Sequence, residues 1–421
     1  MKILIVNTYD LAGGAARATY RLHHALLEQD VDSQMLVIGK VSDDRTVTKL
    51  LSDFGKVKNR LRNYQLRFFN KIESYPNKTK TYFSTSFLSF SNIVDKINEM
   101  NPDIVHLHWI CNEMIKIEDL VKIKAPIVWS LHDMWAFTGG CHYDEECDRY
   151  LESCGKCKVL GSRVENDLSK SIFLKKQKTF SKMNNMTIVG LSQWLSDCAK
   201  KSILLKNKKH LALPNCIDIN VFKPFDQAKS RELWSLPKDK KLVLFGAMGA
   251  TSDPRKGFRE LIEALKKMTC KDLELVVFGS SQPENTPNFG FKTHYLGSLA
   301  DDVSLVTLYS AVDVMVVPSL QEAFGQTASE SMSCETPVVA FGATGLLDIV
   351  DHQKNGYLAK PYEIDDLAYG IKWVLENKSY DELCQNARKK IVREFDSVLV
   401  AKKYIKLYKD TLNNDQCNMS E

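Results

Sequence analysis

The sequence predicts an α/β protein built from two Rossmann-like domains, each with a doubly wound parallel sheet. The first observation is length, because 421 residues exceed one ordinary core and suit two domains of roughly 200 residues each. The second is that short apolar runs bounded by Gly, Asn, Asp or Pro alternate with longer segments of helical period. The third is that this alternation occurs twice along the chain. Such a protein is expected to bind its ligand in a cleft between the domains, at the carboxyl ends of the strands.

The elements follow in order from the apolar periodicity. In the first half, we expect a helix at 15–29 and buried strands at 2–6, 33–38, 104–107, 127–131 and 187–191. In the second half, we expect strands at 242–245, 273–278, 312–317 and 337–340, with helices at 258–268, 327–333 and 364–376. Apolar residues recur at helical spacing among lysines in 398–412, which predicts a final amphipathic helix.

The domain boundary is expected where the pattern breaks into turn residues at 213–218, followed by Pro224 and Pro237. This divides the chain into a first domain of residues 1–213, a second domain of residues 214–397, and a C-terminal helix and tail of residues 398–421.

Composition excludes several classes of protein. Hydrophobic residues make up 44% and charged residues 26%, which is typical of a soluble globular chain. The first apolar run is too short for a signal-peptide core, and no run approaches a membrane span, so we expect a cytoplasmic protein. A nucleic-acid partner is the least expected, because no base-stacking motif accompanies the basic residues.

The formal net charge is only +5, but the segment 49–80, bounded by Lys49 and Lys80, holds nine basic residues against two acidic ones. A solvated face is one interpretation. The other is contact with a phosphorylated acceptor or with an anionic membrane surface, which would make the protein peripheral at the inner face of the plasma membrane.

The first motif with a chemical meaning is Gly13-Gly14-Ala15-Ala16-Arg17, which follows the first strand and opens a helix. Two glycines let backbone N–H groups approach a phosphate, and the helix N-terminus adds partial positive charge. The spacing is neither that of a Walker A loop nor that of a dinucleotide site, and a tight turn without a ligand is the alternative.

The second motif lies in residues 249–257, between the first strand of the second domain and its helix. Arg255 and Lys256 stand where a strand-to-helix loop faces the ligand, so they are candidates to clamp a diphosphate. A basic helix start on the surface is the alternative, but a helix N-terminus disfavours positive charge unless an anion is near.

The third and most specific motif occupies residues 318–330, directly after the strand at 312–317. Glu322 lies in a loop with Gly325, and Glu330 lies eight positions on, inside the next helix. Carboxylates are natural acceptors for the hydroxyls of sugar and ribose, and two at this offset can reach different parts of one long ligand. The alternative is an exposed helix with ordinary acidic residues.

With these motifs the sequence resembles retaining glycosyltransferase family 4, which has the GT-B fold, over nearly the whole chain. The matching residues are Gly13-Gly14, Ser130-Leu131-His132-Asp133, Pro214-Asn215, Arg255-Lys256-Gly257, and the pair Glu322 and Glu330. The resemblance implies a nucleotide-diphosphate sugar as donor and a glycan or lipid-linked acceptor, in the synthesis of cell-surface polysaccharide such as capsule, exopolysaccharide or O-antigen. It also implies that the final helix crosses over and packs back on the first domain.

The resemblance implies a role for each site residue. Gly13 and Gly14 would contact the donor phosphate, and Arg255 with Lys256 would neutralise the departing diphosphate. Glu322 would hold hydroxyls of the donor sugar, Phe324, Gly325 and Gln326 would line the sugar and phosphate, Glu330 would bind the ribose, and His132 would sit by the reacting sugar. Transfer would need no metal or other cofactor. A catalytically silent sugar-nucleotide-binding regulator of a polysaccharide assembly complex is the alternative.

Four of the eleven cysteines cluster at Cys141, Cys147, Cys154 and Cys157, within the loop 139–162. Cys154 and Cys157 have the spacing of a zinc knuckle, so we expect a structural, non-catalytic zinc ion. Reduced packing cysteines or disulfides are the alternatives. Because Cys141 follows His132 by nine residues, a metal here would stiffen the acceptor side rather than take part in the chemistry.

Overall fold

The computed structural model describes residues 1–50, 71–87, 92–246, 249, 251–268, 272–282, 290–299 and 301–419. The chain forms two compact units, Met1–Pro214 with Ala401–Glu421, and Asn215–Val400. Most of the basic segment 49–80, including Lys56, Lys58, Arg60, Arg62 and Arg67, lies outside the described residues. Its contact with a membrane surface therefore stays a prediction.

The first unit is a seven-stranded parallel sheet with the strand order β3-β2-β1-β4-β5-β6-β7. The strands are β1 Lys2–Tyr9, β2 Asp32–Gly39, β3 Val47–Lys49, β4 Ile104–Leu107, β5 Ile127–Leu131, β6 Met186–Gly190 and β7 Lys209–Ala212. The winding reverses between β1 and β4, where Val6 pairs with Leu107. Ligands of such sheets bind beyond the carboxyl ends of the strands at this reversal.

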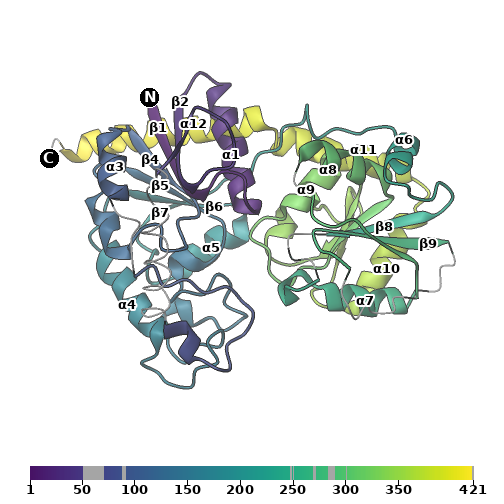
Figure 1. The fold of residues 1–421 in the computed structure, drawn as a ribbon, viewed down its shortest axis with the longest axis horizontal. Coiled ribbons are helices and arrows are strands. Elements are labelled where there is room, and N and C mark those ends of the chain that lie inside the picture. The colour runs from purple at the N-terminus through teal and green to yellow at the C-terminus, as the bar shows by residue number, and fades with distance from the viewer. Residues whose placement is uncertain are drawn as a thin grey trace. The chain divides into compact units, whose positions relative to one another are not determined.

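Helices and helical turns of the first unit connect these strands (Figure 1). The α-helices are α1 Gly14–Leu27, α3 Ile93–Glu99, α4 Leu168–Phe180 and α5 Gln193–Lys201. The 3-10 turns are η1 Lys71–Ser74, η2 Ile117–Lys122, η3 Trp135–Phe137 and η4 Arg149–Leu151. The helix α1 begins at Gly14, one residue before the predicted start, and its buried residues recur at helical spacing from Ala16 to Leu26.

The second unit is a six-stranded parallel sheet with the order β10-β9-β8-β11-β12-β13. Its strands are β8 Lys241–Gly246, β9 Leu273–Phe278, β10 Thr293–Tyr295, β11 Val314–Val317, β12 Val338–Phe341 and β13 Gly356–Ala359. The winding reverses between β8 and β11, where Val243 pairs with Val314. The two motifs of this unit follow these two strands.

Helices cover both faces of the second sheet, with α7 and α10 on one side and α8, α9 and α11 on the other (Figure 1). The α-helices are α6 Gln227–Leu233, α7 Phe258–Lys266, α8 Asp302–Ala311, α9 Gln326–Ser333, α10 Ile364–Leu375 and α11 Tyr380–Glu394. The 3-10 turns are η5 Pro254–Lys256 and η6 Thr344–Asp348. Val243, Leu261, Val316 and Ile371 are fully buried in the core beneath α7 and α10. The predicted fold class, two Rossmann-like parallel-sheet units, is confirmed.

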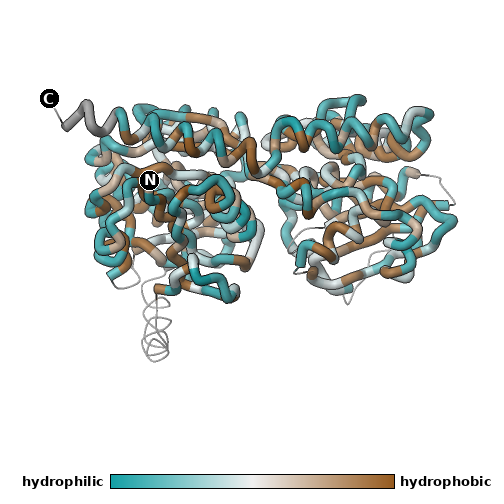
Figure 2. Tube along the Cα trace, turned by 90° about the horizontal axis from the view of Figure 1, so that it is seen from above, coloured by the Kyte–Doolittle hydropathy of each residue, from teal (hydrophilic) through white to brown (hydrophobic). Residues whose placement is uncertain are grey.

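The last helix, α12, spans Ser397–Met419 and belongs to the first unit from Ala401 onward. Its apolar face is buried at Val400, Tyr404, Leu407 and Tyr408. The alternation of hydrophilic and hydrophobic residues is visible along the helix that ends at the C label in Figure 2. The Tyr404 and Tyr408 hydroxyls bond to residues of β5 and β4, so this helix is tied to the first sheet by specific polar contacts as well as by apolar burial.

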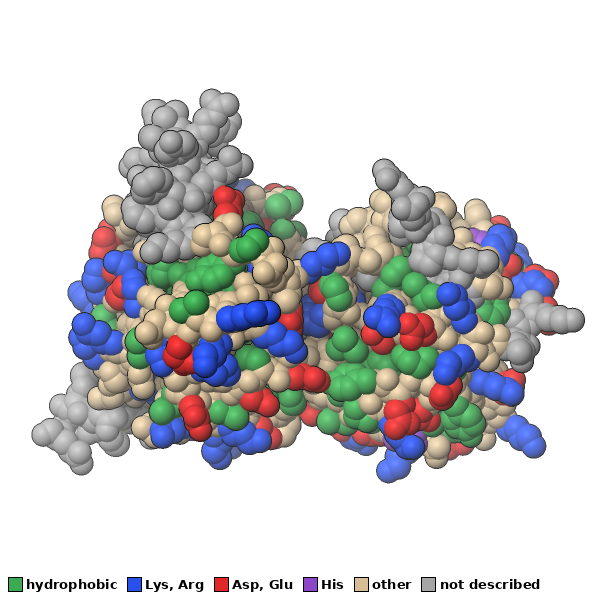
Figure 3. All heavy atoms as spheres, turned by 90° about the horizontal axis from the view of Figure 1, so that it is seen from below, with side chains coloured by type: hydrophobic (Ala, Val, Ile, Leu, Met, Phe, Trp, Pro, Cys, Tyr) green, Lys and Arg blue, Asp and Glu red, His purple; other side chains and the backbone are tan. Residues whose placement is uncertain are grey.

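Lys and Arg side chains are interspersed with Asp and Glu over the face of the molecule that Figure 3 shows. Within the described ranges, no helix combines the length and the apolar character that crossing a membrane requires.

Candidate active site

Two loops at the carboxyl edge of the second sheet bring Arg255, Lys256 and Glu322 together. The Lys256 Nζ lies 2.6 Å from Glu322 Oε2, and Arg255 Nη1 lies 3.8 Å from the same oxygen. Arg255 is itself held in place, because its guanidinium bonds to Asp253 and donates to the carbonyl oxygen of Gln321. The structure therefore places two cations against one carboxylate at the point where the sheet reverses its winding.

Gly257 makes this close approach of the two loops sterically feasible. Its φ of 74° is in the left-handed region, and a Cβ here would lie 1.8 Å from the carbonyl oxygen of Pro318. The Leu320 amide donates to the Arg255 carbonyl at 2.8 Å, which joins the loops by a backbone hydrogen bond. Any larger residue at position 257 would have to push the two loops apart.

The charge state of Glu322 follows from these contacts. Burial works to raise the pKa of its carboxyl, but the positive charges of Lys256 and Arg255 outweigh burial, so the pKa is lowered from 4.5. The carboxylate is consequently ionised at neutral pH. It can accept hydrogen bonds from ligand hydroxyls while it orients the two cations.

The other residues of the third motif have more enclosed positions. Gly325 precedes α9 with a φ of 107°, and a Cβ there would lie 2.7 Å from Leu346. Phe324 is buried and packs edge-on against Phe395. These two residues shape the loop through packing.

Glu330 is 4% exposed, and its carboxylate accepts a hydrogen bond of 2.9 Å from the Tyr309 hydroxyl. Gln326 donates to the other Glu330 oxygen at 3.4 Å, while the Gln326 Oε1 atom is buried with no hydrogen bond among the described residues. Glu330 is therefore more buried than expected of a carboxylate that accepts from a ribose in solvent. It lies beside the Gln326 side chain, whose Oε1 atom still lacks a hydrogen-bond donor in the described part of the structure.

In the first unit, the glycine pair opens α1 at the end of the loop that follows β1. Gly13 has a φ of 99° and offers no side chain to cap the helix, and a Cβ on Gly14 would meet no atom within 4 Å. Asp10 fixes the preceding loop, since its carboxylate accepts from the amides of Leu11, Val41 and Ser42. The loop before α1 is thus held by hydrogen bonds, and the space beside Gly14 is free of other described atoms.

His132 follows β5 and belongs to a chain of histidines within the same unit. Its Nε2 lies 2.9 Å from His108 Nδ1, and the His108 ring lies 4.1 Å from the His106 ring. His106 in turn bonds to the Tyr408 hydroxyl of α12 at 2.7 Å. His108 is 4% exposed, and its Nε2 has no hydrogen bond in the described part of the chain.

These three histidines are neutral at physiological pH. Burial lowers the pKa of His132 to about 4, although the negative charge of Asp133 acts to raise it. Burial also lowers the pKa of His106 to about 3. The pKa of His108 falls well below 6.5 for the same reason, helped by its two histidine neighbours. His132 is therefore suited to hydrogen bonding rather than to carrying positive charge.

Asp133 fixes the loop that follows β5 through hydrogen bonds. It accepts from Trp109 Nε1 at 2.9 Å and from the Trp135 amide at 2.8 Å, and it pairs with His142 at 2.6 Å. Sequence reasoning passed over His106, His108 and His142. The spacing of His106 and His108 was an available signal, because residues i and i+2 of a strand face the same side.

Cys141, Cys154 and Cys157 are buried, Cys147 is half-buried, and none of the four forms a disulfide. Burial raises the pKa of the Cys141 thiol, and the nearby Cys157, Cys154 and Cys147 raise it further. Among the described residues, however, no three His, Cys, Asp or Glu side chains are placed to hold one metal ion. The structure lends the predicted zinc ion no support, and metal content remains to be measured.

The solved structures confirm the fold class. Sucrose-phosphate synthase from Thermosynechococcus elongatus matches with a TM-score of 0.68 and 17% identity over 98% of this chain and 100% of that chain. The HepE protein of Anabaena, in complex with UDP-glucose, matches with a TM-score of 0.62 and 17% identity over 97% of this chain and 100% of that one. At such identities the likeness shows the fold alone, which is GT-B.

Sequence comparisons give a more specific likeness than the solved structures do. Residues 226–391 match the family model of glycosyl transferases group 1. A putative colanic acid biosynthesis glycosyl transferase of Escherichia coli K12, WcaC, is 23% identical over 382 residues, which is 85% of this chain and 86% of that protein. The chain thus resembles GT-B glycosyltransferases of bacterial surface polysaccharides.

A second relative is the N,N'-diacetylbacillosaminyl-diphospho-undecaprenol alpha-1,3-N-acetylgalactosaminyltransferase of Campylobacter jejuni. It is 26% identical over 224 residues, which is 51% of this chain and 58% of that enzyme. The chain spans about half the length of the first curated relatives that it matches.

Proposed function

We propose that this chain is a retaining glycosyltransferase that moves a sugar from a nucleotide-diphosphate sugar to a glycan or lipid-linked acceptor in surface-polysaccharide synthesis. The observation that carries the proposal is the contact of Lys256 and Arg255 with Glu322 in the unit that matches glycosyl transferases group 1. A leaving diphosphate needs paired cations, and a donor sugar needs an ionised acceptor for its hydroxyls.

In the proposed reaction, the bond between the sugar C1 and the diphosphate oxygen breaks, and a bond from C1 to the acceptor oxygen forms on the same face. The acceptor proton passes to a phosphate oxygen of the leaving nucleoside diphosphate. Lys256 and Arg255 would stabilise the charge that develops on the diphosphate, while Glu322 would hold the sugar. Catalysis is then positioning and electrostatic stabilisation, with no protein nucleophile and no metal ion.

The first unit would supply the acceptor side. The open start of α1 at Gly13 and Gly14 offers backbone N–H groups to a donor phosphate. His132 would hydrogen-bond the reacting sugar as a neutral imidazole, and His108 would set its tautomer through the 2.9 Å bond between their rings.

The donor can be identified by thermal unfolding with a panel of UDP-, GDP- and ADP-sugars. A ligand present at 100 times its dissociation constant stabilises the native state by ~2.7 kcal/mol. We expect one nucleotide series to raise the melting temperature of the wild-type protein and to have little effect on Lys256→Met. If no sugar nucleotide shifts the wild-type protein, the proposed donor class is wrong.

The alternative, a silent regulator, would bind a sugar nucleotide without cleaving it. The same purified protein distinguishes the two, because a transferase slowly hydrolyses its donor when no acceptor is present. Release of nucleoside diphosphate by the wild-type protein, and its loss in Lys256→Met, would exclude the regulator.

A further inference from the structure

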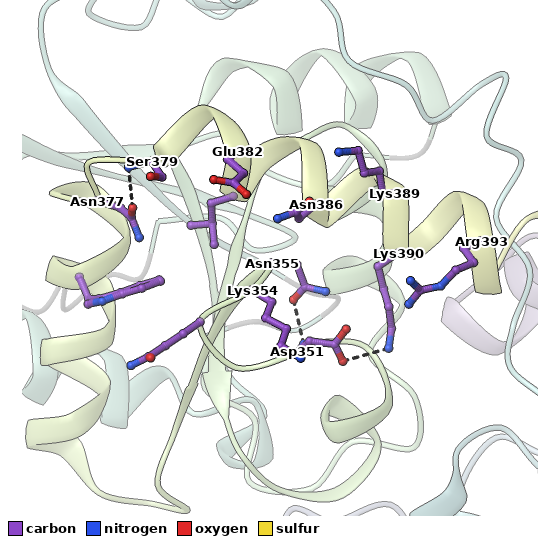
Figure 4. A pocket seen from close by; sticks show the side chains of 13 residues that line it. Asp351, Lys354, Asn355, Asn377, Ser379, Glu382, Asn386, Lys389, Lys390 and Arg393 are labelled. Carbon is purple, nitrogen blue, oxygen red and sulfur yellow. Dashed lines mark hydrogen bonds and ion pairs between the residues drawn. The ribbon is translucent and has the colours of Figure 1, made fainter.

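A cavity of about 540 Å³ lies in the second unit, away from the candidate active site. It is lined by the turn that precedes β13, by the end of α10 and by α11 (Figure 4). That turn ends where Gly356 pairs with Val338, the first residue of β12, so the cavity lies at the amino edge of the sheet. Lys256 and Glu322 follow β8 and β11 at the opposite, carboxyl edge of this sheet.

The lining is rich in groups that both donate and accept hydrogen bonds. Amide side chains come from the turn before β13, from the connection between α10 and α11, and from α11, at Gln353, Asn355, Asn377 and Asn386. Two carboxylates, Asp351 and Glu382, face the same space, and Trp373 and Leu383 are its apolar members. Such a lining suits a ligand that carries many hydroxyls and one ring face, and it does not suit a purely apolar ligand.

Asn355 provides an unused donor inside the cavity. It is 2% exposed, and its Oδ1 accepts a hydrogen bond of 2.8 Å from the Asp351 amide. Its Nδ2 makes no hydrogen bond with any described residue, and Figure 4 shows the amide beside Asp351. An amide N–H without a protein partner is available to a water molecule or to a ligand that accepts from it.

Two of the four cations of the lining, Lys390 and Arg393, form ion pairs, whereas Lys354 and Lys389 form none within the described residues. The Lys390 ammonium lies 3.1 Å from both Asp351 and Glu394, and the Arg393 guanidinium pairs with Glu394. Glu382 adds a further negative charge to the lining. A polyanion such as a diphosphate would meet Asp351 and Glu382 as well as the amines, so competition between tripolyphosphate and a saccharide decides between these two classes of ligand.

We propose that this cavity is a second carbohydrate site, which binds a hydroxyl-rich saccharide segment through the amides of Asn355 and Asn386 and the ring of Trp373. The site is separate from the transfer site, and its occupancy does not depend on the proposed transferase activity. In a polysaccharide-building enzyme it would hold a distant part of the glycan chain and raise the local concentration of acceptor ends.

The test is binding of the full-length protein to a microarray of bacterial surface glycans, followed by titration of the best-bound oligosaccharide with detection of tryptophan fluorescence. We expect Asn386→Ala to weaken binding at least tenfold, and Trp373→Ala to do the same where it folds. Lys378→Ala is the matched control, because Lys378 is exposed between α10 and α11 but does not line the cavity, and it should bind as the wild type does.

Two further arms separate this site from other sources of binding. Lys256→Met should retain full saccharide affinity, since it alters only the donor site. Inorganic tripolyphosphate should fail to displace the saccharide. The proposal is overturned if no arrayed glycan binds, if Asn386→Ala binds as tightly as the wild type, or if tripolyphosphate competes for the cavity.

Discussion

Replacing Lys256 by Met would remove the closest cation from Glu322 while keeping the length and the apolar stem of the side chain. The two side chains are only 15% and 14% exposed, and Arg255 would remain at 3.8 Å from the carboxylate. Breaking a fully buried ion pair costs ~3–5 kcal/mol, and the residual exposure and the second cation reduce this, so we expect a loss of about 2–3 kcal/mol of unfolding free energy.

The same substitution should lower turnover much more than this loss of stability would suggest. Removing one preorganised charge from a site where negative charge develops typically slows a reaction by about 10²–10³-fold. The reason is that the Lys256 ammonium would stabilise the leaving diphosphate in the transition state, in addition to its pairing with Glu322 in the resting protein.

A double-mutant cycle separates these two roles. Glu322→Gln is isosteric, and in the combined variant neither charge is left buried without its partner, so part of the lost stability should return. Turnover should stay low because the cation is still absent and because the carboxylate proposed to hold the sugar is absent too. Urea unfolding and the release of nucleoside diphosphate measure the two quantities. Arg259→Met, which breaks an exposed pair with Glu263 on α7, is the control and should change both very little.

Recovery of turnover together with stability in the combined variant would refute this reasoning. It would mean that Lys256 acts only as a structural partner of Glu322.

Three further predictions follow from other parts of the structure. The free energy of unfolding should fall as the pH drops from 6.5 toward 4, because the unfolded chain then takes up protons while the buried His106, His108 and His132 stay neutral in the native state. The slope approaches ~1.4 kcal/mol per pH unit for each histidine. Urea titrations at pH 7.5, 6 and 5 measure this slope, and a stability that does not depend on pH would contradict the neutral burial of the three histidines. Gly257→Ala should destabilise the native state by about 1–3 kcal/mol and reduce turnover, since a Cβ there meets Pro318 at 1.8 Å, and an unchanged melting temperature would show that the loops yield freely. Metal analysis of protein purified without chelators should settle the cysteine cluster: stoichiometric zinc would support the sequence-based expectation, and four titratable thiols in a metal-free native protein would end it.

Most of the fold could be predicted from the sequence, because a buried parallel strand is a continuous apolar run and the strong runs are unmistakable. The strand expected at 273–278 is β9, and the helix expected at 364–376 is α10, which ends one residue earlier than predicted. The strands β3, β7, β10 and β13 were missed for physical reasons. β3 and β10 have only three residues each. β7 is partly exposed and carries Lys209 and His210, and β13 is short and begins with a glycine.

The site could be predicted only in part. Arg255, Lys256 and Glu322 were recognisable because each follows a strong strand, and parallel strands end at one edge of the sheet. Their pairing could not be predicted, because it depends on how closely two loops approach at Gly257. The hydrogen bond from Tyr309 to Glu330 depends in the same way on the packing of α8 against α9, which no local pattern encodes.

Our central proposal is that the second unit binds an activated sugar and that transfer of this sugar from its diphosphate retains the anomeric configuration. It is tested most directly by following the identified donor with proton and phosphorus NMR in the presence of the wild-type protein. We predict the appearance of nucleoside diphosphate, with the first-formed sugar product in the same anomeric configuration as the donor, and no release by Lys256→Met. Absence of nucleoside diphosphate, or a first product of inverted configuration, would contradict the account.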